Sequence, residues 1–120
     1  MENLEKEIQS IIAGKVDTSE EAREFYSHDA SMFELRPEVV VYAKNSNDIQ
    51  SIVQFVASRK KEYPNLSVVA RSGGTCMSGG AIGESIVIDF NKHFTNITSV
   101  SETEATAQPG VWYRDFEAAT

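Results

Sequence analysis

A glycine-rich segment between two short apolar runs constrains the fold of this chain more than any other feature. The segment, residues 71–83, reads RSGGTCMSGGAIG and holds five of the seven glycines. It separates LSVVA (66–70) from IVIDF (86–90), two β-branched runs that are typical of buried strands. A plain connection takes about two to six residues. A longer loop with so little side-chain bulk is therefore expected to do more than turn the chain.

The loop has the chemistry to hold an anion. Glycine allows positive φ and lets a ligand approach the main chain closely. Successive amide N–H groups in such a loop form a concave nest for anionic oxygens. Ser72, Thr75 and Ser78 add hydroxyl donors, which favours a diphosphate held mainly by neutral groups. The alternative is a tightly turned or flexible glycine loop with no ligand, which composition alone does not exclude.

Two standard nucleotide-binding motifs are absent. Gly74 and Gly79 have the spacing of a P-loop, but Gly80 and Ala81 stand where that motif needs Lys followed by Ser or Thr. No GxGxxG sequence occurs in the chain. P-loop and Rossmann-type nucleotide binding are therefore disfavoured.

Charge and composition narrow the classes of function. The 120 residues suffice for one small domain, and 18 Asp and Glu against 11 Lys and Arg give a net charge of −7. With no basic tract, the chain is a poor candidate for nucleic-acid or anionic-membrane binding. One cysteine excludes an internal disulfide and a multi-cysteine zinc site. Since no transmembrane or signal-peptide pattern is seen, we expect a reducing, cytoplasmic setting.

The remaining pattern predicts an α+β (α/β-like) fold, a small mixed sheet flanked by helices. VVVY (39–42) is a third short strand, and strands joined by one helix form a right-handed βαβ unit. Apolar residues at helical spacing predict helices over 2–14 and 46–61, the second with Ile49, Ile52, Val53 and Val56 as its apolar stripe.

Three weaker elements complete the expected fold. Thr18 and Glu21 fit a capping box, which predicts a short helix from about residue 19 to residue 27. Residues 95–101 and 103–108 are expected to pair as a hairpin. A helix over 111–120 is expected to turn Trp112, Phe116 and Ala119 toward the core.

Several motifs together resemble those of FAD-linked oxidases that have a PCMH-type (vanillyl-alcohol oxidase-like) FAD-binding domain. They are YSHDAS (26–31), PEVVV (37–41), RSGGT (71–75) after a VVA strand, SGGA (78–81), IVID (86–89) and AQPGV (107–111). They run in order from about residue 20 to residue 120. The pattern is most similar to glycolate oxidase D subunits and D-lactate dehydrogenase-like enzymes.

The resemblance implies that the glycine loop wraps the diphosphate of FAD. It assigns cofactor contacts to Ser72, Gly73, Gly74, Thr75 and Cys76, with Ser78, Gly79 and Gly80 near the ribityl or flavin side and Pro109 and Gly110 beside the cofactor. Some members attach FAD covalently through a histidine where this chain has Thr75. Non-covalent binding is therefore implied.

Other chemically able side chains have plainer interpretations. Arg71 is either a cofactor contact or a surface charge. Cys76 is expected to be a small buried residue rather than a reactive thiol. His28 and His93 lack metal-ligand spacing, so no metal site is assigned. Asp89 is expected to anchor the turn after its strand.

The resemblance also implies that cofactor binding and catalysis are carried out by different domains. The FAD domain of the family is longer than this chain, and a separate domain supplies the substrate-binding and catalytic groups. We therefore expect a partial domain at 1–120, with a helical lead-in at about 1–36 and a pyrophosphate-loop subdomain at about 37–120. No residue is assigned as catalytic. Little activity is expected of the chain alone, and an apolar edge is expected to make it self-associate.

The implied parent is an FAD-dependent dehydrogenase or oxidase that moves a hydride from a 2-hydroxy acid, such as lactate or glycolate, to FAD. Three alternatives stay open from the sequence. One is a flavoenzyme of the same fold that acts on an alditol or an amino sugar. The second is a non-catalytic phosphate- or nucleotide-binding module, and the third is a structural domain with an empty loop.

Overall fold

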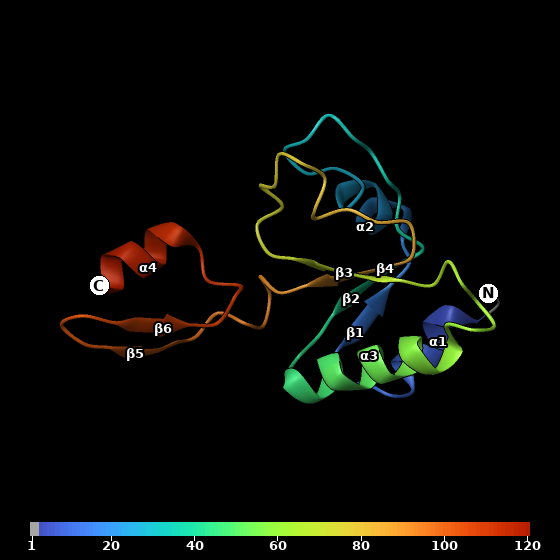
Figure 1. The fold of residues 1–120 in the computed structure, drawn as a ribbon, viewed down its shortest axis with the longest axis horizontal. Coiled ribbons are helices and arrows are strands. Elements are labelled where there is room, and N and C mark those ends of the chain that lie inside the picture. The colour runs from blue at the N-terminus through green and yellow to red at the C-terminus, as the bar shows by residue number, and fades with distance from the viewer. Residues whose placement is uncertain (1–2) are drawn as a thin grey trace.

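The computed structural model describes residues 3–120, and its centre is a four-stranded sheet in the order β1-β2-β4-β3 (Figure 1). The strands are β1 (Lys15–Asp17), β2 (Val39–Tyr42), β3 (Val68–Arg71) and β4 (Ile86–Asp89). β1 is antiparallel to β2, whereas β4 is parallel to both β2 and β3. The α+β class and the mixed sheet that the sequence predicted are therefore confirmed.

β4 occupies the centre of the parallel part of the sheet. All four of its residues are buried, whereas three of the four in β3 are not. A strand buried on both faces needs a neighbour on each side, so β4 inserts between β2 and β3. Those two strands are parallel and joined by one helix, as expected, but they are not adjacent.

The position of β4 gives the glycine loop a structural reason for its length. β3 and β4 are adjacent and parallel, so the chain must return from the carboxyl end of β3 to the amino end of β4. Such a crossover takes about a dozen residues or more, and residues 72–85 provide it. The length of the loop therefore follows from the topology, whereas its glycine content does not.

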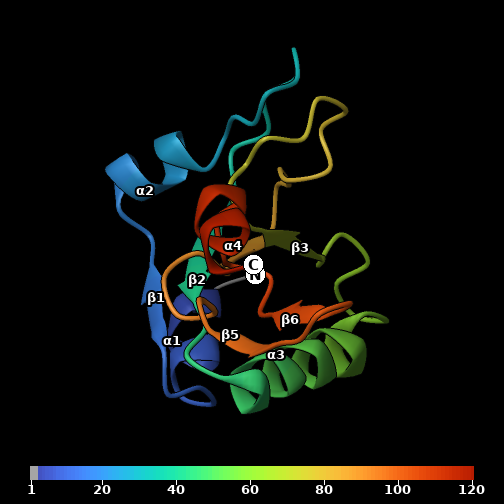
Figure 2. The same ribbon diagram turned by 90° about the vertical axis from the view of Figure 1, so that its left-hand side faces the viewer.

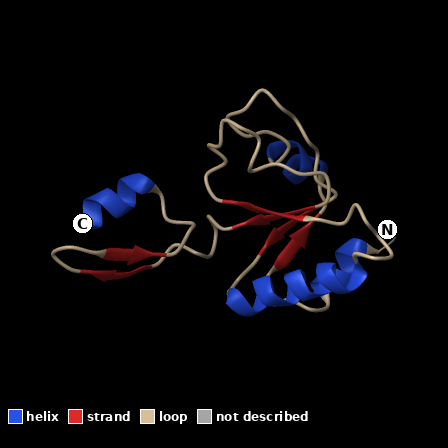
Figure 3. Ribbon diagram, viewed as in Figure 1, coloured by secondary structure: helices blue, strands red, loops and turns tan. Residues whose placement is uncertain are grey.

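Helices cover both faces of the sheet, as Figures 1 and 3 show. On one face, α1 (Leu4–Gln9) and α3 (Ser46–Arg59) bury their apolar residues against alternate residues of β2 and β4. On the other face, Ala22 of α2 (Glu20–Phe25) and the following Tyr26 pack on Val40 and Val87. The alternation of strand side chains thus divides the apolar residues into two layers.

The first helix is shorter than predicted, and a strand was missed. α1 ends at Gln9, and Ile11, expected on its buried face, is 40% exposed; residue 2 lies outside the described residues. The cause is the buried carboxylate of Asp48, which accepts hydrogen bonds from the amides of Ala13 (2.8 Å) and Gly14 (2.9 Å). This long-range contact turns the chain into β1, which the local pattern did not reveal.

The structure shows which residues cap the amino ends of α2 and α3. The cap of α2 is Ser19 rather than Thr18, since its hydroxyl accepts from the Ala22 amide at 3.2 Å. Asn45 caps α3 by accepting from the Asp48 amide at 3.0 Å.

The apolar stripe of α3 is partly wrong. Ile52 is fully buried, and Ile49 and Val56 pack against the core, but Val53 is 52% exposed. Phe55, which the predicted stripe did not include, is partly buried and packs against the core.

The C-terminal part lies to one end of the sheet (Figures 1 and 2). The predicted hairpin is confirmed as β5 (Ile97–Val100) and β6 (Ala105–Ala107), with α4 (Tyr113–Ala119) beside it. The predicted core contacts of α4 are wrong, because none of its residues is buried and Trp112 is 50% exposed. The hairpin offers mostly alanine and polar side chains, so little apolar surface is available to bury the helix.

None of the helices within residues 3–120 has the length and apolar character needed to cross a bilayer.

Asp48→Asn is expected to lower the free energy of unfolding by about 2–3 kcal/mol, because it weakens the acceptors of three amides, those of Ala13, Gly14 and Lys44. Burial raises the pKa of Asp48, but these amide donors outweigh burial and hold the pKa below its ordinary value. The stabilisation is thus present above the ordinary pKa and is lost as pH falls through the lowered one. Urea unfolding at pH 7 and pH 3 measures both effects.

Asp115→Asn, at an exposed position of α4, serves as the control for Asp48→Asn. An equal stability loss in the two variants, or a loss for Asp48→Asn that is the same at both pH values, would contradict this account.

Candidate functional site

The glycine loop, residues 72–85, leaves the sheet at the carboxyl end of β3 and runs beside the segment around residue 30 (Figure 1). Ligands of open α/β sheets commonly bind outside the carboxyl ends of the strands. Two segments distant in sequence flank the loop. Residues 26–34 contact its second half, and residues 109–112 contact its first half.

The main-chain amides in the first part of the loop have no hydrogen-bond partner among the described residues. Among the described residues, 3–120, no acceptor is found for the amide N–H of any residue from 72 to 79. Hydrogen bonding resumes at Gly80, which donates to the Cys76 sulfur at 3.3 Å, and at Ala81, which donates to Asp29 Oδ2 at 3.4 Å. Residues 72–79 are half-buried or exposed, so these eight donors are accessible to an anionic ligand.

Two glycines give the loop its shape. Gly74 has φ of 69° and Gly79 has φ of 81°, both in the left-handed region that residues with a Cβ rarely adopt. A Cβ on Gly74 would also lie 2.4 Å from Nη2 of Arg71. The predicted need for glycine is therefore confirmed at these two positions.

Hydrogen bonds tie the first half of the loop to the predicted Pro109–Gly110 turn. Ser72 Oγ donates to the Pro109 carbonyl at 2.7 Å, and Asn91 Nδ2 donates to Ser72 Oγ at 3.3 Å and to the Gly110 carbonyl at 2.9 Å. Asn91 was missed by the sequence analysis, since a lone Asn after a strand carries no distinctive signal. Three of the predicted cofactor residues, Ser72, Pro109 and Gly110, are thus brought together.

Close packing against the backbone of Phe90 and the ring of Trp112 explains the two glycines at this junction. Gly110 donates its amide to the Phe94 carbonyl at 2.8 Å, and a Cβ there would lie 1.8 Å from the Phe90 carbonyl oxygen. A Cβ on Gly73 would lie 2.8 Å from the ring of Trp112. Trp112 therefore packs on the loop rather than on the core.

The second half of the loop has different neighbours. Thr75 and Ser78 are exposed, Cys76 is half-buried rather than buried, and the Cβ position of Gly79 lies 3.3 Å from Phe33. Of the predicted residues Ser78, Gly79 and Gly80, Gly79 thus lies against the segment around Phe33, whereas Gly80 lies against Cys76.

Arg71 is not a surface charge. It is 7% exposed, and its Nη1 donates to the carbonyls of His28 (2.6 Å) and Tyr26 (3.4 Å), while the guanidinium stacks 5.0 Å from the centre of the Tyr26 ring. Tyr26 donates its hydroxyl to the buried Asp89, and burial together with this hydrogen bond raises the pKa of Tyr26. Asp89 also accepts from the Lys92 amide at 2.9 Å, which confirms its role as an anchor for the turn.

Acidic groups surround the N-terminal flank of the loop. Hydrogen bonds from the Ser31 side chain and amide and from the Ala81 amide lower the pKa of Asp29. His28 lies 3.6 Å from Glu24 and 3.4 Å from Glu34, and all three side chains are exposed. Ion pairs in solvent contribute little stability. The sequence analysis did not foresee this grouping, which depends on a bridge between residues 28 and 34.

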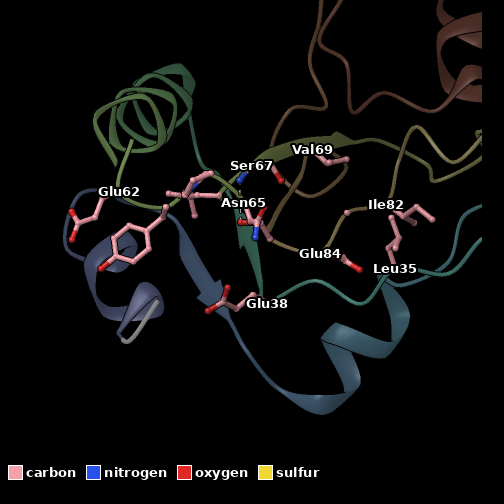
Figure 4. Close-up of a pocket in the computed structure, with 13 residues that line it drawn as sticks. Leu35, Glu38, Glu62, Asn65, Ser67, Val69, Ile82 and Glu84 are labelled. Carbon is pink, nitrogen blue, oxygen red and sulfur yellow. Dashed lines mark hydrogen bonds between the residues drawn. The ribbon is translucent and has the colours of Figure 1, made fainter. Parts of the chain in front are cut away.

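A cavity of about 850 Å³ lies at the amino ends of β3 and β4, away from the free amides (Figure 4). Its rim carries the carboxylates of Glu38, Glu62 and Glu84, which repel a diphosphate. Residues 72–79, which carry the free amides, do not line this cavity.

The architecture and the loop define an FAD-binding domain of the PCMH type, and comparisons with known proteins agree. A family model described as an FAD binding domain matches residues 37–120. This is more than half of the chain, so the chain belongs to that FAD binding domain family. Free amides, left-handed glycines and hydroxyls in one loop fit the diphosphate of FAD.

Curated relatives include two D-2-hydroxyglutarate dehydrogenases. The one from Escherichia coli is 29% identical over 96 residues, which is 80% of this chain and 9% of that protein. The one from Haemophilus influenzae is 29% identical over 100 residues, which is 82% of this chain and 10% of that protein. The chain thus spans about a tenth of the length of these relatives, and they give no support to a particular likeness to glycolate oxidase.

Solved structures with the same fold include 4-ethylphenol oxidase from Gulosibacter chungangensis and p-cresol methylhydroxylase. The first has a TM-score of 0.76 at 20% identity and covers 98% of this chain and 23% of that chain. The second has a TM-score of 0.75 at 16% identity and covers 96% and 23%. The predicted PCMH-type fold is therefore confirmed.

Gly74→Val is expected to weaken FAD binding at least about tenfold, because a β-branched residue at positive φ is strained by about 1–3 kcal/mol and displaces the loop amides. Fluorescence titration of FAD with the purified protein measures the loss. Thr106→Val is the control: it introduces the same side chain at an exposed position of β6, outside the loop. Similar FAD affinity in Gly74→Val and wild type would contradict the role of the loop backbone.

Proposed function

We propose that this chain holds the diphosphate of FAD in an oxidoreductase that oxidises a 2-hydroxy acid. The single observation that carries the proposal is the run of free amides at residues 72–79, at the carboxyl end of the parallel strands. The membership in the FAD binding domain family names the cofactor. When bound, FAD accepts a hydride from the substrate carbon.

The residues of the chain bind and position the cofactor rather than react with it. The amides of 72–79 donate to phosphate oxygens, and the hydrogen bonds among Ser72, Asn91 and the Pro109–Gly110 turn hold the loop in place. No side chain of this chain is assigned as general base or substrate ligand. We propose that another part of the full-length protein supplies those groups and covers the flavin, and that residues 1–36 and 37–120 act as lead-in and pyrophosphate-loop subdomain.

The proposed substrate class rests on the relatives. Their names specify D-2-hydroxyglutarate, a 2-hydroxy acid, and they match four-fifths of this chain. The alternative is a flavoenzyme of the same fold with another substrate. The solved neighbours support this alternative, because their names specify other substrates. One is a 6-hydroxy-D-nicotine oxidase from Arthrobacter nicotinovorans, at 22% identity and a TM-score of 0.69.

Three further properties are proposed. FAD is bound without a covalent link to the loop, because Thr75 offers no imidazole for attachment. The protein works in the reducing cytoplasm. The 120-residue chain on its own self-associates through apolar side chains such as Phe25, Phe33 and Met77, which are 68%, 57% and 81% exposed.

The protein, expressed at its full natural length, is expected to show the visible absorption bands of flavin and to release FAD into the filtrate on acid precipitation. Anaerobic addition of D-2-hydroxyglutarate, D-lactate or glycolate is expected to bleach those bands, because hydride transfer reduces the flavin. Alditols and amino sugars serve as controls. A colourless folded protein that takes up no added FAD contradicts the cofactor, and bleaching by the controls alone contradicts the substrate class.

A further inference from the structure

Arg71 is a buried cation at the base of the glycine loop. It is 7% exposed, and within residues 3–120 no carboxylate lies within 4.0 Å of its guanidinium. A charged side chain that is taken out of water without a counter-ion is costly. A buried arginine at this position therefore needs a partner that compensates the cost of burying its charge.

The guanidinium is hydrogen-bonded through one of its three nitrogens and also lies 5.7 Å from the centre of the Phe25 ring. Nη1 donates inward to the carbonyls of His28 and Tyr26, and the ring of Tyr26 lies against the planar group. Nε and Nη2 have no acceptor among the described residues. Since no fully buried side-chain nitrogen or oxygen there lacks a partner, these two atoms reach the solvent.

The two nitrogens without hydrogen bonds, Nε and Nη2, lie beside Gly74. The Cβ position of this glycine is 2.4 Å from Nη2 and 2.8 Å from Nε. Gly74 lies within the run of free amides, and the loop residues 72–85 include no Lys or Arg. The open donors of Arg71 are thus placed beside the main-chain donors of the loop.

We propose that Arg71, through Nε and Nη2, donates to a phosphate oxygen of the ligand held by the loop. The proposal rests on the function proposed above and adds a charged donor to a site otherwise built from neutral groups. A hydrogen bond from a charged donor is about twice as strong as a neutral one. Because Nη1 is already anchored, little side-chain freedom is lost on binding.

This role explains how a chain with a net charge of −7 attracts an anion. The positive charge of Arg71 is fixed at the base of the loop, at the end of β3. Its burial reduces the screening of this charge by salt. Asp29 lies close enough to feel the charge of Arg71, which contributes to lowering the Asp29 pKa. The carboxylate of Asp29 is itself occupied by the amides of Ser31 and Ala81.

Titration calorimetry of the Arg71→Met variant with FAD and with ADP tests the proposal. Both ligands carry the diphosphate, and both dissociation constants are expected to rise about 10- to 100-fold, the worth of a charge-assisted hydrogen bond. Riboflavin, which has no phosphate, is expected to keep its affinity. The salt dependence of FAD binding is expected to become shallower, because one ionic contact is lost.

Arg59→Met is the matched control. Arg59 also stacks on an aromatic ring, that of Phe55 at 5.1 Å, and pairs with Glu7 at 3.0 Å, but it lies on α3. Both substitutions lower the net charge by one. Only Arg71→Met is expected to weaken binding of the diphosphate ligands.

The outcomes separate this inference from the function on which it rests. Wild-type protein that binds neither FAD nor ADP overturns both. Wild-type binding with an unchanged affinity and salt dependence in Arg71→Met overturns the inference alone, as does an equal loss for FAD, ADP and riboflavin, which shows a purely structural role. If Arg71→Met does not fold, Arg71→Lys applies the same criteria, since lysine cannot contact both carbonyls and the ligand together.

Discussion

The adjacency of two parallel strands, β3 and β4, is the constraint on which the rest of the structure depends. β4 is buried along its whole length and lies between β2 and β3. The chain must therefore return from the carboxyl end of β3 to the amino end of β4. The crossover contains no helix, so its main-chain groups have no regular partners. A row of free amide donors at the carboxyl end of β3 is suited to an anion.

A buried polar cluster fixes the loop to the sheet at this end. Arg71 joins β3 to the carbonyls of residues 26 and 28, and Tyr26 joins the same segment to Asp89 at the end of β4. Asn91 then joins the turn after β4 to Ser72 and Gly110. Segments spread over more than eighty residues of sequence thus converge on one loop, so the free amides are held by a rigid base.

The sequence predicted the conformation of the glycine loop better than it predicted the edges of the fold. The need for Gly74 and Gly79 was recognised because positive φ favours glycine over other residue types. The strands were recognised because their apolar runs are short and β-branched. The missed features depend on contacts between distant residues. Asp48 ends α1 and creates β1 through amides more than thirty residues away, and Arg71 is buried because residues 26–28 cover it. α4 was expected to pack on the core because the spacing of its apolar residues predicts one apolar face. That spacing does not tell whether another element covers the face.

Hydrogen–deuterium exchange of the loop amides, with and without FAD, tests the central claim most directly. The account predicts fast exchange at residues 72–79 in the free protein, since those amides have no partner, and marked protection of the same residues when FAD is bound. Slow exchange in the free protein would show that the amides are already hydrogen-bonded. Bound FAD with no protection at 72–79 would show that the cofactor is held elsewhere, and either result would contradict the account.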